Sequence, residues 1–131
     1  MGVMIVGTGV DIIEVQRIKE SIAKYGEQFL HRIYSKEEIE YCSQKPLHQQ
    51  HLHYAARFAA KEALAKALGT GIGETISFKE VSIMKDEKGK PYIVGVRQQS
   101  PTWLNDVIIH CSLSHTHQFA VATVIIERCT T

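Results

Sequence analysis

A carboxylate and an ammonium group four residues apart are the first groups in this sequence that could do chemistry together. Glu62 and Lys66 lie in the stretch 58–68, where alanine, leucine, lysine and glutamate all favour a helix. Four-residue spacing puts both side chains on one helix face, about one turn apart. The glycines between Gly69 and Gly73 would end that helix and let the backbone approach a bulky group. The segment suits a phosphate held with a divalent metal, or a surface Glu–Lys pair followed by an ordinary glycine C-cap.

Asp11 offers a second carboxylate, about fifty residues away. It follows the apolar residues 3–10, which we expect to form a buried strand. A buried carboxylate without a partner costs several kcal/mol, so Asp11 needs either a helix to cap or a cation to bind. Together with Glu62 it would suit Mg²⁺, which takes one or two protein carboxylates and completes its shell with water and phosphate oxygens. Phosphoryl transfer uses such an ion to neutralise charge on the transferring group.

The histidines do not complete a zinc pattern. His51 and His53 fall on a predicted helix, where residues two apart diverge. His115 and His117 fall in a predicted turn, and no cysteine lies near enough to complete a standard zinc spacing. His115 is therefore either a turn residue or a proton carrier or phosphate contact. The order of residues in a P-loop is absent, since the glycines follow their helix instead of preceding one.

Composition narrows the class of protein. The chain has 131 residues, 44% hydrophobic and 22% charged, as expected for one domain spanning 1–131. Its net charge of +1 gives no global field for nucleic acid. The sequence contains no apolar run of roughly eighteen residues and no leader-like start, so we expect a cytoplasmic protein without membrane contact. Three widely spaced cysteines argue against a disulfide framework.

In the first half, the pattern predicts mostly helices. From Ile12 to Ile22 apolar residues recur at helical spacing. Ser35 and Glu38 form a capping-box pattern that opens a short helix running to about Cys42. After a break at 43–46, the long helix would begin after Leu47 and end near Leu68.

The second half is predicted to be mainly antiparallel sheet. Strands over 81–84 and 92–94 would form a hairpin, and so would strands over 107–113 and 119–126, joined by a tight turn at 114–118. Residues 101–104 would form a short helical connector. The predicted fold class is α+β, with helices packed on a mainly antiparallel sheet.

Several spaced motifs also match a known family. From Val6 to Arg128 the chain closely resembles the holo-[acyl-carrier-protein] synthases, the small bacterial class of 4′-phosphopantetheinyl transferases. The matching segments, in chain order, are Gly9-x-Asp11 with Arg17, then 57–63, 69–73, 88–92 and 112–116.

The resemblance implies an activity and an assembly. Such an enzyme moves 4′-phosphopantetheine from coenzyme A, its co-substrate, to a serine of apo acyl carrier protein and releases adenosine 3′,5′-bisphosphate. It would be a homotrimer with the 4′-phosphopantetheinyl transferase fold and with sites between subunits. Asp11 and Glu62 would bind Mg²⁺ with the pyrophosphate of coenzyme A. Lys66 would contact phosphate. The general base stays open among Lys66, His115, Asp11 and a metal-activated water.

The resemblance also implies contacts to both substrates. Lys90 and Pro91 would reach the adenine end from a neighbouring subunit, and Arg17 and Arg32 would dock the acidic carrier. Residues 14–32 hold four positive and three negative side chains, a net of +1, so carrier affinity and its salt sensitivity would be modest. Two other hypotheses remain: a non-catalytic nucleotide-binding module and a Mg²⁺-dependent phosphohydrolase. The full set of implied coenzyme A contacts is Arg57, Lys66, Gly69, Thr70, Gly71, Lys90, Pro91 and His115.

Overall fold

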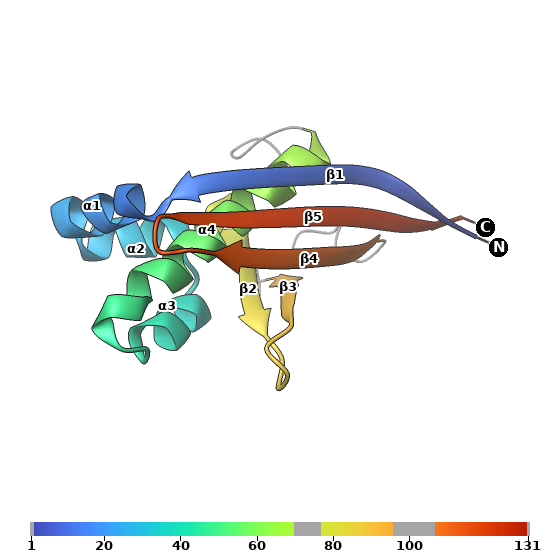
Figure 1. The fold of residues 1–131 in the computed structure, drawn as a ribbon. Helices are drawn as coiled ribbons and strands as arrows, with labels where there is room; N and C mark the ends of the chain where they lie inside the picture. The colour runs from blue at the N-terminus through green and yellow to red at the C-terminus, as the bar shows by residue number, and fades with distance from the viewer. Residues whose placement is uncertain (1, 70–76, 96–106, 131) are drawn as a thin grey trace.

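The computed structural model describes residues 2–69, 77–95 and 107–130 of the chain. These residues form an α+β fold in which helices pack on antiparallel strands (Figure 1), as the sequence predicted. None of the helices described here combines the length and the apolar character needed to cross a membrane. The elements in chain order are β1 (Gly2–Glu14), α1 (Val15–Tyr25), α2 (Glu27–Ile33), α3 (Lys36–Ser43), α4 (Leu47–Leu68), a short 3-10 helix η1 (Phe78–Glu80), β2 (Val81–Lys85), β3 (Pro91–Gly95), β4 (Val107–His115) and β5 (Phe119–Thr130).

The main sheet has the strand order β1-β5-β4, with both neighbouring pairs antiparallel. The first strand therefore pairs with the last, and the two chain ends lie side by side (Figure 1). Asp11 lies opposite Ala122 in this register, and His115 lies opposite Ala120. Strands β2 and β3 form a separate hairpin.

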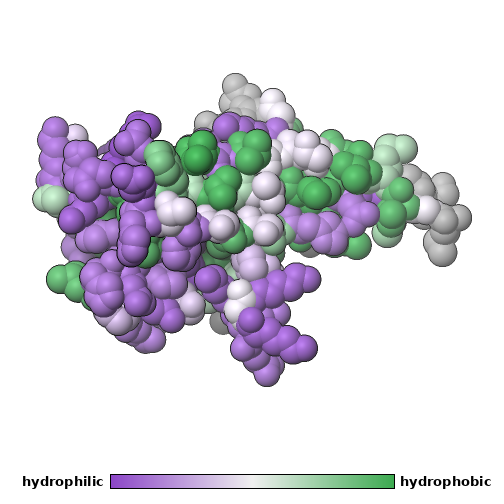
Figure 2. All heavy atoms as spheres, in the orientation of Figure 1, coloured by the Kyte–Doolittle hydropathy of each residue, from purple (hydrophilic) through white to green (hydrophobic). Residues whose placement is uncertain are grey.

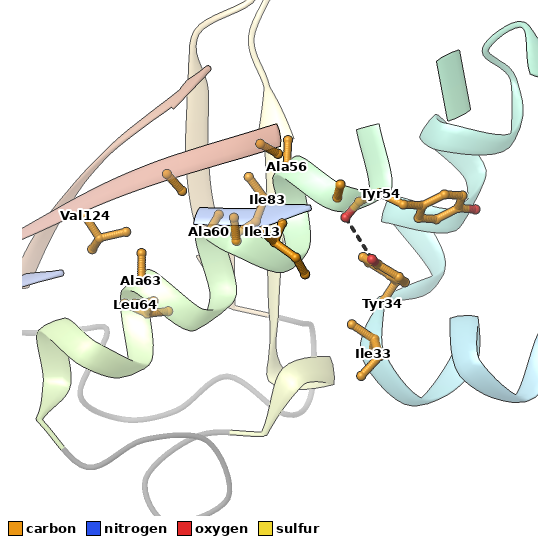
Figure 3. Packing of buried hydrophobic residues seen from close by; sticks show 14 of the residues in the cluster. Ile13, Ile33, Tyr34, Tyr54, Ala56, Ala60, Ala63, Leu64, Ile83 and Val124 are labelled. Carbon is orange, nitrogen blue, oxygen red and sulfur yellow. Dashed lines mark hydrogen bonds between the residues drawn. The ribbon is translucent and has the colours of Figure 1, made fainter. Parts of the chain in front are cut away.

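Helix α4 covers one face of the main sheet, and small residues let it approach closely. Alternate residues of β5 from Ala120 to Ile126 point towards it and are 2% exposed or less. Figure 3 shows Ala60 and Ala63 of α4 gathered with Ile13 of β1 and Val124 of β5. A Cβ atom added at Gly9 would overlap the carbonyl oxygen of Ala63, and one added at Gly7 would overlap that of Ala67. The alanines of α4 thus make room for a neighbouring strand.

The opposite face of the sheet is exposed and carries several large apolar side chains. Figure 2 shows hydrophobic side chains along this face, and they include Val10 and Ile12, which are 56% and 64% exposed. The prediction of a buried strand over residues 3–10 is therefore wrong for the single chain. The strand is also longer than predicted and runs past Asp11 to Glu14.

The helical pattern predicted from Ile12 begins three residues later, at Val15. Ile12 and Ile13 instead alternate between the two faces of β1, exposed and buried in turn. The helical segment also breaks at Gly26, whose φ of 57° lies in the left-handed region, and α2 follows as a separate helix that the sequence pattern did not predict.

Other predicted elements are confirmed. Ser35 and Glu38 form the capping box of α3, and α4 begins at Leu47 and ends at Leu68. Both predicted hairpins are present. The cysteines at 42, 111 and 129 are free thiols. The predicted connector at 101–104 lies outside the described residues.

Candidate active site

The close packing of α4 on β1 brings the two predicted metal carboxylates together. Asp11 lies two residues after Gly9 on the strand face that α4 covers, and Glu62 precedes Ala63, the residue against which Gly9 packs. Asp11 and Glu62 line one pocket of about 320 Å³. The predicted alternative for Asp11, a helix N-cap, is wrong, because Asp11 lies inside β1 and α1 is capped at Glu14.

The two carboxylates influence each other. Burial raises the pKa of Glu62 above its ordinary value, the negative charge of Asp11 raises it further, and Lys66 opposes both effects. A partly buried pair of like charges is stabilised by a cation.

Lys66 supplies such a cation from the last turn of α4. Its Nζ lies 3.1 Å from Oδ1 of Asp11 and donates a second hydrogen bond to the carbonyl oxygen of Val10, also at 3.1 Å. The ammonium of Lys66 therefore pairs with Asp11 on the strand, and among the ion pairs of the described residues none joins it to Glu62. The predicted alternative, a surface ion pair between Glu62 and Lys66, is therefore replaced by the pair between Lys66 and Asp11.

The donor set fits Mg²⁺. Within residues 2–69, 77–95 and 107–130, no cluster of three or more histidine, cysteine, aspartate or glutamate residues could hold a metal ion. An ion in this pocket would therefore find two hard carboxylate ligands and take its other ligands from water or substrate oxygens. Two protein carboxylates with an otherwise open shell is an arrangement that Mg²⁺ accepts readily.

One wall of the same pocket is apolar, and the sequence analysis missed it. Phe58 of α4 and Phe29 of α2 line it together with Ile13 and Ile18. Phe58 lies four residues before Glu62, on the same helix face, so its position could have been read from the spacing. Phe29 could not, because it belongs to the helix that the pattern did not predict.

Of the two predicted docking arginines, Arg17 lines the pocket of Asp11 and Glu62 and Arg32 does not. Arg17, on the first turn of α1, is exposed and lines the pocket of Asp11 and Glu62. Arg32 is exposed on the last turn of α2 and is not among the residues that line this pocket.

His115 is separated from the carboxylates within one chain. It lies on β4, on the far side of β5 from Asp11, and adjacent strands are about 4.8 Å apart. It is not among the residues that line the pocket of Asp11 and Glu62. The structure therefore does not bring His115 to the pocket of its own chain.

Arg57, which was predicted to contact coenzyme A, is buried instead. Its side chain has no exposed surface. Nε donates to the carbonyl oxygen of Ile83, one terminal nitrogen donates to that of His53, and the guanidinium stacks on Tyr41 at 4.5 Å. A fully buried side chain cannot contact a ligand in this arrangement, so Arg57 ties α4 to β2 instead.

The remaining predicted contacts lie elsewhere. Gly69 caps α4 with φ of 82° and donates to the carbonyls of the last turn, as expected of a glycine C-cap. Thr70 and Gly71 lie outside the described residues. Lys90 and Pro91 lie where the exposed β2–β3 turn enters β3, and neither lines the pocket of Asp11 and Glu62.

Comparison with known proteins places this chain among enzymes of one kind. Residues 7–124 match the model of the 4′-phosphopantetheinyl transferase superfamily. A holo-[acyl-carrier-protein] synthase of Koribacter versatilis is 44% identical over 126 residues, which cover 95% of this chain and 99% of that protein. The crystal structure of a holo-(acyl-carrier-protein) synthase from Bacillus anthracis in complex with CoA (3′,5′-ADP) is 38% identical, with a TM-score of 0.83 over 96% of this chain and 99% of that one. The Helicobacter pylori synthase in complex with coenzyme A is 34% identical, with a TM-score of 0.78 over 91% and 98%.

Proposed function

The chain belongs to the 4′-phosphopantetheinyl transferase superfamily, among its holo-[acyl-carrier-protein] synthases, and we propose that it modifies an acyl carrier protein with the arm of coenzyme A. In this reaction the serine hydroxyl of the carrier forms a bond to the phosphorus that bears pantetheine. The pyrophosphate bond breaks, adenosine 3′,5′-bisphosphate leaves, and the serine proton passes to a base or to solvent. The observation that carries the proposal is the pairing of Asp11 and Glu62 in one pocket, with Lys66 on Asp11.

Asp11 and Glu62 would hold Mg²⁺, which supplies charge neutralisation for the pyrophosphate when it is bound. Two basic residues of the chain could also interact with the negative charge of the pyrophosphate. Lys66 presents an ammonium that pairs with Asp11, and Arg17 is one of the residues that line the pocket. Both are positively charged groups that suit an anionic substrate.

We assign Lys66 the role of neutralising the charge of the phosphate, and not that of removing the serine proton. In the ion pair with Asp11 its ammonium is already a hydrogen-bond donor to two oxygens. A protonated ammonium has no lone pair to accept a proton, whether it pairs with Asp11 or with the phosphate. His115 would reach a pocket only from a neighbouring chain, as would Lys90 and Pro91 near the adenine end.

The carrier would dock over α1 and α2, with Arg17 at the pocket and Arg32 further along. The apolar wall made by Phe29 and Phe58 suits the non-polar part of a substrate beside the metal site. Because the basic surface is mild, we expect shape and apolar contact to contribute as much as charge.

A homotrimer would complete the site. The outer sheet face exposes Val10, Ile12, Ile108 and Ile125 in the single chain, an apolar surface that favours burial against other copies. The number of copies is inferred from the family resemblance. We place the protein in the cytoplasm on the same ground, where fatty acid synthesis would use its product.

The test is to incubate the protein with coenzyme A, Mg²⁺ and an apo carrier and then to weigh the carrier. We expect one phosphopantetheine mass to be added and an equal amount of adenosine 3′,5′-bisphosphate to appear. Consumption of coenzyme A without a carrier would indicate a phosphohydrolase. Binding of coenzyme A without turnover would indicate a non-catalytic module, and either result would overturn the proposal.

A further inference from the structure

Lys66 contacts Asp11, one of the two carboxylates that we assign to the metal. Its Nζ lies 3.1 Å from Oδ1 of Asp11, within a site whose other carboxylate is Glu62. The ammonium is thus already the counter-ion of the carboxylate pair. A divalent ion that used the same Asp11 oxygens would lie within a few ångströms of this positive charge, and the two would repel each other.

The two partners of this ion pair differ in their freedom to move. Asp11 is held inside β1, opposite Ala122, and its side chain is 16% exposed. Lys66 lies in the last turn of α4 and its side chain is 55% exposed. A lysine ammonium at the end of a four-carbon stem can move several ångströms without any change in the backbone. The lysine, and not the aspartate, can therefore leave.

We propose that Lys66 is an exchangeable counter-ion, which holds the Asp11 carboxylate in the free enzyme and gives it up when a divalent cation enters. This inference rests on the metal site proposed above. The released ammonium would need a new anionic partner, and a substrate phosphate beside the metal is the chemical class that fits. Metal and phosphate would then bind cooperatively, because each favours the state in which Lys66 has left Asp11.

The proposal gives Lys66 two opposite effects, which separates it from a residue that merely adds positive charge to a phosphate site. Lys66 weakens binding of the metal alone, since the metal must displace it. It strengthens binding of metal and phosphate together, since it then pairs with the phosphate. The metal would therefore enter the site mainly with coenzyme A.

The test measures Mn²⁺ binding to the full-length protein by the loss of the electron paramagnetic signal of free Mn²⁺, with no coenzyme A present. We expect Lys66→Met to bind Mn²⁺ about three- to tenfold more tightly than the wild type, as removal of one nearby screened charge implies. The matched control is Lys36→Met, which removes an exposed lysine at the start of α3, outside the pocket lining. It should bind Mn²⁺ as the wild type does.

A second measurement follows the lysine itself in the wild-type protein. The rate of acetylation at Lys66, read by peptide mass spectrometry, should rise when Mg²⁺ is added, whereas the rate at Lys36 should not change. Unchanged labelling of Lys66 at a Mg²⁺ concentration that fills the site would overturn the exchange.

The outcomes also separate this inference from the proposed function. Equal Mn²⁺ affinity of the wild type and Lys66→Met, with binding abolished by Asp11→Asn, would overturn the exchange and leave the metal site standing. Tighter binding by both lysine variants would mean a general charge effect, and it too would overturn the exchange. Absence of Mn²⁺ binding in every variant would overturn the metal site along with it.

Discussion

Lys61 and Glu38 form an ion pair inside the core: Nζ lies 2.6 Å from Oε1, and both side chains are fully buried. Burial lowers the pKa of Lys61, and the adjacent carboxylate of Glu38 opposes that shift. Backbone groups supply the other hydrogen-bond partners of the pair. Glu38 accepts from the N–H groups of Ser35 and Ile83, and Lys61 donates to the carbonyls of Ile33, Phe78 and Val81. The pair thus joins α2, α3 and β2 to α4 at the residue next to Glu62.

Removing one partner of this pair should be costly. Lys61→Met leaves the charge of Glu38 buried without a partner, and we expect a loss of about 3–5 kcal/mol in the free energy of unfolding. The double variant Lys61→Met with Glu38→Leu should lose less than the sum of the two single changes. Urea unfolding of the four proteins provides the cycle, and additive losses would contradict a direct coupling.

The contact between β1 and α4 should depend on the absence of a side chain at position 9. Gly9→Ala places a Cβ atom where the carbonyl oxygen of Ala63 lies, so helix and strand must separate. We expect a loss of at least about 1–3 kcal/mol, typical of overpacking, together with weaker metal binding because Asp11 follows two residues later. The control is Thr8→Ala, at an exposed neighbouring position of the same strand. If Gly9→Ala unfolds at the same urea concentration as Thr8→Ala, the close packing is not needed.

His53 should make the protein sensitive to acid. Burial lowers its pKa from 6.5 to about 4, and the positive charges of Arg57, Lys85, Lys45 and His115 add to the effect. Between these two values the unfolded chain binds the proton and the folded chain does not, so the free energy of unfolding falls as the pH drops from about 6.5 to about 4. Urea unfolding at several pH values should give a flatter profile for His53→Gln. An equal slope in both proteins would assign the acid sensitivity to other groups.

A comparison of two substitutions at Lys66 should separate its two possible roles. Arginine keeps the positive charge but does not give up its proton at ordinary pH. If Lys66 neutralises phosphate charge, Lys66→Arg should keep much of the rate of carrier modification, whereas Lys66→Met should lose about tenfold or more. If Lys66 is the general base, both variants should lose activity to a similar extent. Initial rates across a pH series would measure this difference.

The long helix and the hairpins could be predicted because their signals are local. Residues 58–68 are mostly strong helix formers closed by Gly69, and Ser35 with Glu38 is a self-contained capping pattern. The break at Gly26 could not be read in the same way, since a glycine within an apolar-periodic segment is often tolerated. The exposure of β1 could not be predicted either, because its sequence is apolar on both faces and does not reveal which one α4 covers.

For the candidate site, the chemical groups could be predicted from the sequence, whereas the contacts between them depend on the fold. The spacing of Glu62 and Lys66 correctly placed both on one helix face, but it could not say that Lys66 would pair with Asp11. That pairing depends on how closely α4 approaches β1, and so on Gly7 and Gly9. Arg57 was misassigned because a charged residue in a motif suggests a ligand contact, whereas its burial is a property of the whole fold.

The central claim is that Asp11 and Glu62 form a metal-dependent site for phosphopantetheine transfer. The most direct test is the rate at which an apo carrier gains one phosphopantetheine mass, measured with excess coenzyme A and saturating Mg²⁺. Glu62→Gln removes one proposed ligand charge with little change in shape, and Glu37→Gln, at an exposed position on α3, is the matched control. We expect the control to retain the wild-type rate and Glu62→Gln to lose about a hundredfold or more, since metal charge stabilisation is worth several kcal/mol. A Glu62→Gln protein that modifies the carrier at the rate of the control would contradict the account.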